Sequence, residues 1–159
     1  MKRELREADP EDANNLATID AMVSTHPWSE SQFIIACSNP TPSRGISASE
    51  NVRVLEIDDE ISGFVVYSLV LDEGSIQSIA VAPSWQGQGH AGILLQGALD
   101  ILGSHGAQRC LLEVRASNTA ARRLYDRFGF QQDGIRKKYY PSDSGREDAL
   151  LMSKSPLAK

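Results

Sequence analysis

A β-branched apolar run, a glycine-rich turn and a helical pattern follow one another in residues 79–95, and this stretch constrains the fold most. The apolar run at residues 79–81 ends before Pro83. Gly87 and Gly89 follow, and apolar residues then return with helical spacing. Glycine lets a backbone approach a ligand closely, and the unpaired amides at the start of a helix attract an anion. The stretch therefore predicts a phosphate-binding strand, loop and helix.

Length and charge narrow the class of protein. A chain of 159 residues suits one domain with its own core, so we expect a single domain over residues 1–159. The formal net charge of −5 argues against a surface for duplex nucleic acid and favours a basic peptide partner. The amino terminus lacks an apolar secretion signal, and no run approaches the roughly 18 to 20 apolar residues of a membrane span. We therefore expect a cytoplasmic protein that neither enters a membrane nor binds nucleic acid directly.

Apolar runs bounded by turn residues predict several strands. Those that precede the glycine-rich turn follow one another closely, so we expect adjacent antiparallel pairing. Residues 38–51 are rich in proline, glycine and serine and are interpreted as a mobile surface loop. The expected strands cover residues 2–7, 52–57, 61–71, 75–81, 110–114, 131–140 and 148–152, with residues 141–146 as the turn of the last hairpin.

Helices are expected at four places, each from a cap and an apolar stripe. Asp9 before Pro10 resembles an N-cap with proline at the first helical position. Ser29 and Gln32 have the spacing of a capping box. The residues expected to face the core are Leu16, Ile19, Ala21 and Val23 in the first helix, Phe33, Ile34 and Ile35 in the second, Ile93, Leu94, Ala98, Leu99 and Leu102 in the third, and Ala121, Leu124, Tyr125 and Phe128 in the fourth.

The glycines also fit a dinucleotide-binding fingerprint. Gly87-x-Gly89-x-x-Gly92 has the required spacing, and Glu113 lies about 20 residues further on, where that fold places a ribose-binding acid. Most of the expected strands precede the motif, however, and only one strand–helix–strand unit follows it. A doubly wound sheet would then have too few parallel strands, so we do not favour this alternative.

A second pattern fits better. Gln86-x-x-Gly89-x-Ala91, followed by Asn118 and Tyr125, resembles the GCN5-related N-acetyltransferase (GNAT) family, whose pyrophosphate loop reads Gln/Arg-x-x-Gly-x-Gly/Ala. The resemblance covers nearly the whole chain. It implies an α/β (α+β) fold, with a mixed, mostly antiparallel sheet of about six or seven strands flanked by about four helices and splayed where acetyl-CoA inserts, near Val81. It also implies that acetyl-CoA contacts Ile79, Ala80, Val81, Gln86, Gly87, Gln88, Gly89, His90, Ala91, Gly92, Asn118 and Tyr125.

Stretches at residues 26–30, 112–118, 124–130 and 139–149 are similar to the RimI subfamily. That subfamily acetylates the amino-terminal alanine of a small-subunit ribosomal protein, which implies a protein amino terminus as the partner. One departure is Gly87, because the residue after Gln86 is often arginine in the family. Another is the loop after Cys37, which is longer than usual.

Acetyl transfer to an amine needs a base and an acid. The resemblance implies that Glu113 is the base, and an α-amino group with a pKa near 7.7 to 8.0 needs only a modest one. The alternative is that Glu113 only pairs with a cation such as Arg115. The resemblance implies that Tyr125 protonates the departing thiolate, and the alternative is a core tyrosine. A backbone amide around Val81 would stabilise the oxyanion.

Other residues carry two interpretations each. Asn118 suits a helix cap and a coenzyme ligand, and Trp28, Tyr139 and Tyr140 suit a peptide groove or ordinary packing. Residues 136–138 are interpreted as a solvated strand edge.

The cysteines and histidines do not indicate a metal site. Cys37 and Cys110 lack metal-ligand spacing and are expected as buried free thiols, and the three histidines show no such spacing either. We expect no metal. The coenzyme motifs do not encode the acceptor, so a small amine, a lysine side chain or a non-catalytic CoA-binding module remain as alternatives.

Overall fold

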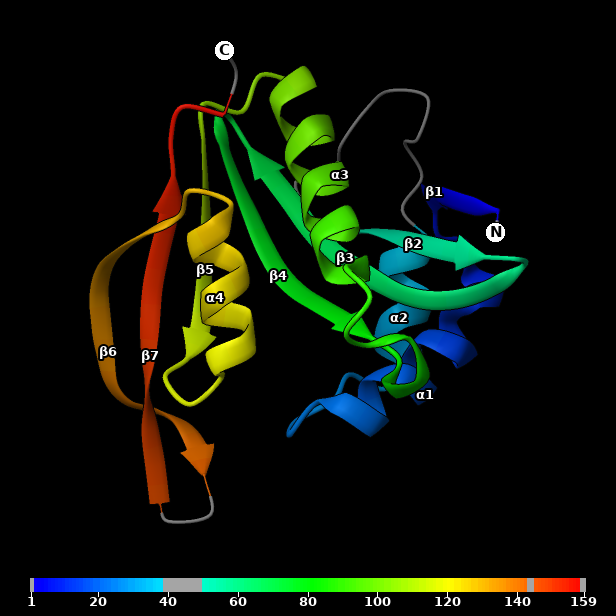
Figure 1. The fold of residues 1–159 in the computed structure, drawn as a ribbon, viewed down its shortest axis with the longest axis horizontal. Helices are drawn as coiled ribbons and strands as arrows, with labels where there is room; N and C mark the ends of the chain where they lie inside the picture. Colours follow the sequence, from blue (N-terminus) through cyan, green and yellow to red (C-terminus); the bar gives the residue numbers. More distant parts are fainter. Residues whose placement is uncertain (1, 39–49, 143–144, 158–159) are drawn as a thin grey trace.

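The computed structural model describes residues 2–38, 50–142 and 145–157, which form one sheet covered by helices on both faces (Figure 1). The seven strands lie in the order β1-β2-β3-β4-β5-β7-β6, and every neighbouring pair is antiparallel except β4 and β5. The sheet is therefore mixed and mostly antiparallel, as expected. Its strands are β1 (Arg3–Glu7), β2 (Asn51–Ile57), β3 (Glu60–Val70), β4 (Glu73–Val81), β5 (Arg109–Arg115), β6 (Gln131–Ser142) and β7 (Gly145–Lys154), and the α-helices of the described residues are α1 (Ala13–Val23), α2 (Glu30–Cys37), α3 (His90–Ser104) and α4 (Thr119–Arg127).

Strand alternation divides the core into two halves. Successive residues of a strand point to opposite faces, so Val54 packs with α1 and α2, and its neighbour Leu55 packs with α3. In Figure 1, α3 and α4 lie in front of the sheet and α1 and α2 lie behind it. The two free cysteines follow the same division, with Cys37 in the first half and Cys110 in the second, both buried as expected.

The sheet splays between β4 and β5. These two parallel strands pair only over residues 73–76 and 109–112, although β4 continues to Val81 and β5 to Arg115. Figure 1 shows the two strands diverging below this point. The expected splay is confirmed, and it opens earlier along β4 than Val81.

Gly63 on β3 allows the end of strand β4 to pack closely against β3. It pairs with Val81, and a Cβ at this position would lie 2.5 Å from the backbone oxygen of Ala80. Only glycine fits there without displacing the backbone, so this residue fixes the position of one wall of the splay.

The capping box at the start of α2 is confirmed. Gln32 donates its backbone N–H to Ser29 Oγ at 3.2 Å, and Ser29 returns a bond to Gln32 Oε1 at 2.8 Å. The predicted buried side is partly wrong, because only Phe33 is buried, whereas Ile34 is 41% exposed and Ile35 is 73% exposed. Each residue turns the helix by about 100°, so consecutive residues cannot share one buried stripe.

The first helix begins later than expected. Asp9 caps a short 3-10 turn (Pro10–Asp12), and α1 starts only at Ala13. The predicted apolar residues Leu16 and Ile19 are buried, whereas Ala21 and Val23 are exposed, which corrects the predicted stripe. As in α2, the periodicity of a short helix left its apolar face ambiguous.

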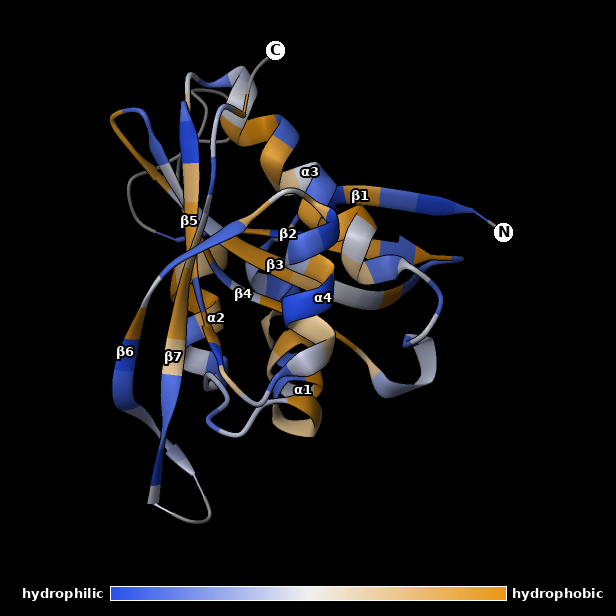
Figure 2. Cartoon of the chain, turned by 60° about the vertical axis from the view of Figure 1, so that its left-hand side comes forward, coloured by the Kyte–Doolittle hydropathy of each residue, from blue (hydrophilic) through white to orange (hydrophobic). Residues whose placement is uncertain are grey.

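The last hairpin, β6–β7, runs further than predicted. Its strands extend to Ser142 and start again at Gly145, so part of the predicted turn at residues 141–146 is strand. The outer strand β6 is mostly hydrophilic, whereas hydrophobic residues concentrate in the central strands (Figure 2). The interpretation of residues 136–138 as a solvated edge is confirmed by their exposure. Most of the predicted loop at 38–51 lies outside the described residues, and no described helix is long and apolar enough to span a bilayer.

Candidate active site

The connection between β4 and α3 has the backbone of an anion-binding loop. Gly87 and Gly89 have φ values of +78° and +85°, a region that other residues adopt only with strain. Apart from the two adjacent residues, no atom of the described part of the chain lies within 4 Å of where a Cβ would stand at either position. Glycine is therefore required by the backbone and not by packing against the chain itself.

The amides of this loop are available to a ligand. Within the described part of the chain, the N–H groups of residues 87–92 donate no hydrogen bond, and the first three belong to the loop while the others open α3. The side chain of Gln86 donates to the oxygen of Val81 at 2.9 Å and fixes the start of the loop. The residues predicted to bind pyrophosphate thus lie together, at the positive end of a helix dipole.

His90 contributes its backbone here and buries its side chain. His90 is 3% exposed, its ring lies 5.5 Å from the Trp85 ring, and its Nδ1 has no hydrogen-bond partner within residues 2–38, 50–142 and 145–157. Burial, with a smaller effect from Arg3, lowers the pKa of His90, so the ring is neutral near pH 7. Trp85 in turn donates to Glu60 Oε1 at 3.1 Å. The Trp85 and His90 rings thus pack against each other at the two ends of the loop formed by residues 87–89.

The end of β4 presents backbone groups to the splay. Residues 77–81 pair with β3 on one side, and no strand of the described residues pairs with them on the side of β5. This segment contains the predicted Ile79, Ala80 and Val81. Apart from the Val81 oxygen, which accepts the Gln86 side chain, its outward N–H and C=O groups make no bond within the described residues and can bind an extended polar chain.

Glu113 and Tyr125 lie on opposite faces of β5. Leu112 and Val114 are buried beneath α3 and α4 in the same core half as Tyr125, so Glu113 between them points to the other face. A molecule that passes between the splayed strands would meet the carboxylate on one face of the sheet and the phenol on the other.

Glu113 has an ion-pair partner that the sequence did not indicate. Its Oε2 lies 3.3 Å from Nε of Arg136, and 35% of the glutamate side chain is exposed. The alternative, that Glu113 pairs with a cation, is confirmed as to the ion pair, but Arg115, the cation suggested for it, pairs with Glu147 at 3.3 Å instead. Arg136 is two strands away in the sheet, and local spacing gives no signal for such a contact.

Tyr125 is enclosed and keeps its proton. Its side chain is 7% exposed and packs 5.7 Å from the Phe130 ring. Burial raises the pKa of Tyr125 to about 12, with smaller contributions from Cys110 and Tyr140. The phenol is therefore a proton donor over the whole neutral range, and both the acid and the core interpretations agree with its position.

Asn118 is a helix cap, as one interpretation predicted. Its Oδ1 accepts the backbone N–H of Ala121 at 3.1 Å at the start of α4. The side-chain amide N–H group makes no bond within the described residues, so it is free to donate to a ligand.

The aromatic residues predicted for a peptide groove fall into two groups. Tyr139 and Tyr140 contact each other with ring centroids 5.1 Å apart, beside the Glu113–Arg136 pair. Trp28 instead packs 5.2 Å from Phe33 and makes no contact with the tyrosines. In Figure 1 the segment between α1 and α2 and the far end of the β6–β7 hairpin both lie at the lower edge of the molecule.

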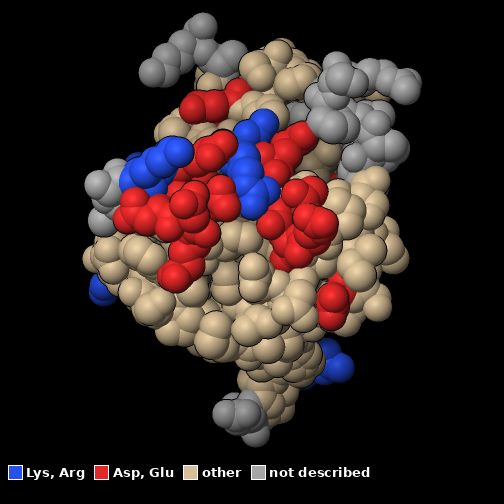
Figure 3. Space-filling model, turned by 90° about the vertical axis from the view of Figure 1, so that its right-hand side faces the viewer, with Lys and Arg blue, Asp and Glu red and all other residues tan. Residues whose placement is uncertain are grey.

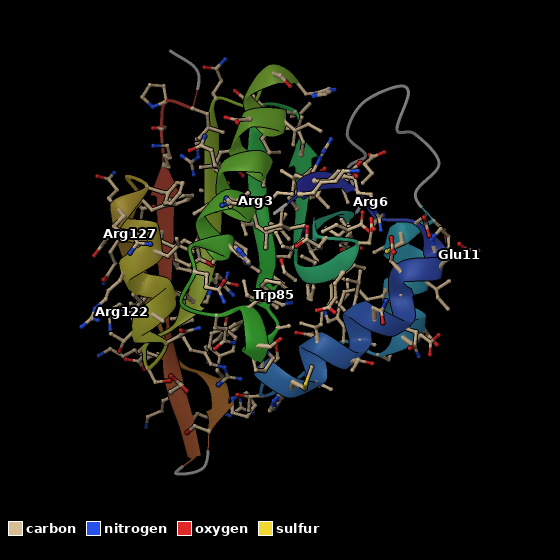
Figure 4. The ribbon with its side chains drawn as sticks, turned by 45° about the vertical axis from the view of Figure 1, so that its right-hand side comes forward. Arg3, Arg6, Glu11, Trp85, Arg122 and Arg127 are labelled. Carbon is tan, nitrogen blue, oxygen red and sulfur yellow. The ribbon has the colours of Figure 1, made fainter. Side chains whose placement is uncertain are left out.

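Two hollows lie beside this arrangement, and the first of them shares Trp85 with it. One of about 370 Å³ is lined in part by Arg6, Asp12 and Glu56, and Arg6 binds both carboxylates, at 2.8 Å and 3.2 Å. Figure 3 shows the acidic side chains gathered on this face, which makes it unsuitable for a phosphate. Another of about 520 Å³ lies between α3, α4 and the last described residues. In Figure 4, Arg122 and Arg127 on α4 are on the opposite side of the molecule from Arg6 and Glu11, with Trp85 between.

The described residues contain no group of histidine, cysteine, aspartate or glutamate side chains that could hold a metal ion.

A model of the acetyltransferase (GNAT) family matches residues 5–130, which is most of the chain. The chain belongs to the GNAT family. Members of this family use acetyl-CoA, and the free loop amides and the splay of this GNAT protein fit its pyrophosphate and its extended arm.

Relatives of this GNAT protein align with it over most of its length. It is 35% identical over 139 residues to the ribosomal protein bS18-alanine N-acetyltransferase of Escherichia coli K12, covering 85% of each chain. It is 36% identical over 144 residues to the protein of that name from Haemophilus ducreyi, covering 90% of this chain and 93% of the relative. The crystal structure of the ribosomal-protein-S18-alanine N-acetyltransferase from Escherichia coli superposes with a TM-score of 0.86 at 32% identity, over 99% of this chain and 96% of that one.

Proposed function

We propose that this protein is a single-domain cytoplasmic enzyme that transfers the acetyl group of acetyl-CoA to the amino-terminal alanine of a small-subunit ribosomal protein. The names of its relatives support this acceptor. The observation that carries the proposal is the position of Glu113 and Tyr125 on opposite faces of β5, beside the splay. This arrangement suits a reaction in which the acceptor and the leaving thiol approach from different sides.

The coenzyme is held mainly by backbone. The amides of residues 87–92 bind the pyrophosphate, and the outward groups of residues 79–81 bind the pantetheine arm and the acetyl carbonyl. Gly87 has no side chain to contribute, so Gln86, Gln88 and the helix dipole of α3 organise this part of the site. The Asn118 side chain adds a donor at the start of α4.

In the proposed acetyl transfer, Glu113 and Tyr125 act from opposite faces of β5. Glu113 removes a proton from the α-ammonium group, and the resulting amine forms a C–N bond with the acetyl carbonyl carbon. A backbone amide near Val81 donates to the oxyanion. The nitrogen of the tetrahedral intermediate then loses its second proton to water as the C–S bond breaks. Tyr125 gives its proton to the CoA thiolate and recovers one from solvent. Tyr139, Tyr140 and Trp28 line the path of the acceptor.

The test compares three peptides that share one sequence after the first residue, taken from a ribosomal protein that begins with alanine. The first has a free amino terminus, the second is blocked there and keeps its lysine side chains, and the third begins with proline. Thiol release from acetyl-CoA and mass spectrometry should show one acetyl group on the alanine nitrogen of the first peptide only. Acetylated lysine in the blocked peptide would favour the alternative acceptor, and no thiol release with any amine would favour a CoA-binding module.

A further inference from the structure

The outer strand of the last hairpin carries an unusual bulge. Arg136 pairs with Ala149 and Tyr140 pairs with Glu147, so residues 137–139 of β6 stand opposite the single residue Asp148 of β7. Lys138 in this bulge has a φ of +52°, although it is not glycine. Such left-handed residues cost free energy and persist where the surroundings hold them.

Asp148 is the residue that holds the bulge. Its Oδ1 accepts the backbone N–H of Lys138 at 3.0 Å. Its backbone oxygen accepts the N–H of Ala116 at 3.0 Å, in the turn between β5 and α4. Asp148 therefore joins the bulge to the end of the strand that carries Glu113.

The bulge changes where two tyrosines point. In a regular strand Tyr139 and Tyr140 would face opposite sides of the sheet. Here their rings are 5.1 Å apart in an edge-to-face contact. The Arg136 guanidinium lies 5.0 Å from the Tyr139 ring and pairs with Glu113, so the tyrosines lie next to the carboxylate.

A second anchor holds the other end of the bulge. Arg115 lies 4.5 Å from the Tyr140 ring and donates to the Pro141 oxygen at 2.7 Å. Glu147 binds Arg115 and accepts the backbone N–H of Ser117 at 3.0 Å through its other oxygen. Burial and the nearby Glu113 carboxylate raise the pKa of Tyr140, which agrees with this proximity.

We propose that Asp148 is a positioning residue for the acceptor: it holds the β6 bulge in the shape that brings Tyr139 and Tyr140 to Glu113, where the two rings and the carboxylate receive a primary ammonium group. Arg115 and Arg136 already lie against the two rings, and Arg136 pairs with Glu113 Oε2, so the rings flank the acceptor and Glu113 Oε1 is the atom that receives its N–H group. The inference rests on the proposed function in one respect, because it takes the acceptor to be an amino terminus.

The kinetic test replaces Asp148, whose carboxylate accepts the hydrogen bond from the Lys138 backbone N–H. Asp148→Ala should raise the KM for an alanine-terminated peptide about tenfold and leave the KM for acetyl-CoA unchanged, because the hydrogen bond that holds Lys138 at its positive φ is lost and the bulge can relax. Asp148→Asn keeps an oxygen acceptor and should restore the peptide KM to within about twofold. An unchanged peptide KM in Asp148→Ala would overturn the proposal.

A second pair of variants tests the bulge without touching Asp148. Lys138→Gly accepts a positive φ and should keep the wild-type peptide KM, whereas Lys138→Val should raise it, because a β-branched residue resists that conformation. Lys137→Val is the matched control, since Lys137 has no positive φ. Equal peptide KM values for Lys138→Gly and Lys138→Val would contradict the role of the bulge.

A third measurement separates this inference from the proposed function. Fluorine NMR of protein labelled with 3-fluorotyrosine should show the Tyr139 and Tyr140 resonances moving when an alanine-terminated peptide is added, with no such movement in Asp148→Ala. If these resonances move in wild type and the peptide is never acetylated, the proposed function fails and the inference stands. If they do not move in wild type, or move equally in Asp148→Ala, the inference fails.

Discussion

The Glu113 carboxylate lies 3.3 Å from Nε of Arg136, which reaches it from β6 across the intervening strand β7. An amine that approaches Glu113 therefore enters a site that already holds a guanidinium group and two tyrosine rings. The pair connects the strand that borders the coenzyme splay to the outer edge of the sheet. This contact explains how the edge strand contributes to a site in the middle of the molecule.

Replacing the candidate base should reduce turnover strongly. Glu113→Gln keeps the shape of the side chain and removes its basicity, so kcat/KM should fall by a factor on the order of 100 or more. Glu73→Gln is the matched control, because Glu73 also forms an exposed ion pair on a strand next to β5, with Arg109 at 3.0 Å. Such exposed pairs stabilise little, so this control should keep its activity. Wild-type rates in Glu113→Gln would remove this residue from the mechanism.

Removing the phenol of Tyr125 should affect chemistry more than binding. Tyr125→Phe keeps the packing against Phe130, so we expect kcat to fall on the order of 100-fold with little change in the dissociation constant of acetyl-CoA. Tyr67→Phe is the control, since Tyr67 is also buried and its hydroxyl accepts a bond from Arg53 at 3.3 Å away from the splay. Steady-state rates and calorimetric titration measure the two quantities. Equal losses of kcat in both variants would count against the acid role.

Local signals in the sequence predicted the helices and strands. Contacts between residues on distant strands could not be predicted from it. Ser29 and Gln32 indicated the cap of α2 correctly, because a capping box depends on neighbouring residues alone. Glycines marked the coenzyme loop for the same reason. Ile34 and Ile35 were assigned wrongly, since an eight-residue helix contains too few turns to define its apolar face.

The acceptor side was the least predictable part. The partner of Glu113 depends on the register of three strands, and β6 shifts its register twice, between Gln132 and Gly134 and between Arg136 and Tyr140. No glycine marks the bulge, because the left-handed residue is Lys138 and Asp148 supplies the hydrogen bond that holds it. The tyrosines could therefore be proposed from their pattern, but their contact with each other could not.

Adding a methyl group to the coenzyme loop should weaken acetyl-CoA binding. Gly89→Ala forces alanine to a φ of +85°, which costs about 1 kcal/mol, and the loop would relax away from the anion-binding shape. Gly106→Ala is matched in φ, at +96°, and in having no neighbour within 4 Å, but it lies beyond the other end of α3. Both variants should lose similar stability, and only Gly89→Ala should bind acetyl-CoA more weakly. Equal affinities in calorimetry would contradict the loop assignment.

The close approach of β3 and β4 predicts a larger loss of stability. Gly63→Ala places a Cβ 2.5 Å from the Ala80 oxygen, so the free energy of unfolding should fall by about 1 to 3 kcal/mol as the end of β4 shifts. The KM for acetyl-CoA should rise with it. Gly134→Ala, also in a strand, meets only an ordinary contact at 3.8 Å and serves as the control. Urea unfolding that gives equal values for the two variants would exclude this packing argument.

Alkaline pH should destabilise the fold. Burial raises the pKa of the Cys110 thiol from 9.0 to about 12 and that of the Tyr125 phenol from 10.0 to about 12. The unfolded chain releases these protons first, so the contribution of each group is complete below its unfolded pKa and is lost as the pH rises toward 12. Each group lowers the free energy of unfolding by about 1.4 kcal/mol per pH unit in that interval.

Two variants should show how much of the loss of stability at alkaline pH comes from Cys110 and how much from Tyr125. Urea unfolding between pH 8 and 11 should show a smaller slope above pH 9 in Cys110→Ala. Tyr125→Phe should keep the wild-type slope between pH 9 and 10 and flatten only above pH 10. A free energy of unfolding that does not change between pH 9 and 11 in the wild type would refute this account.

The most direct test of the whole account is quantitative mass spectrometry of protein amino termini from cells with and without this protein. We predict that the alanine terminus of one small-subunit ribosomal protein is acetylated in the first cells and free in the second. Returning the wild-type chain should restore the modification, and returning Glu113→Gln should not. An alanine terminus that is equally acetylated in both cells would contradict the proposed acceptor.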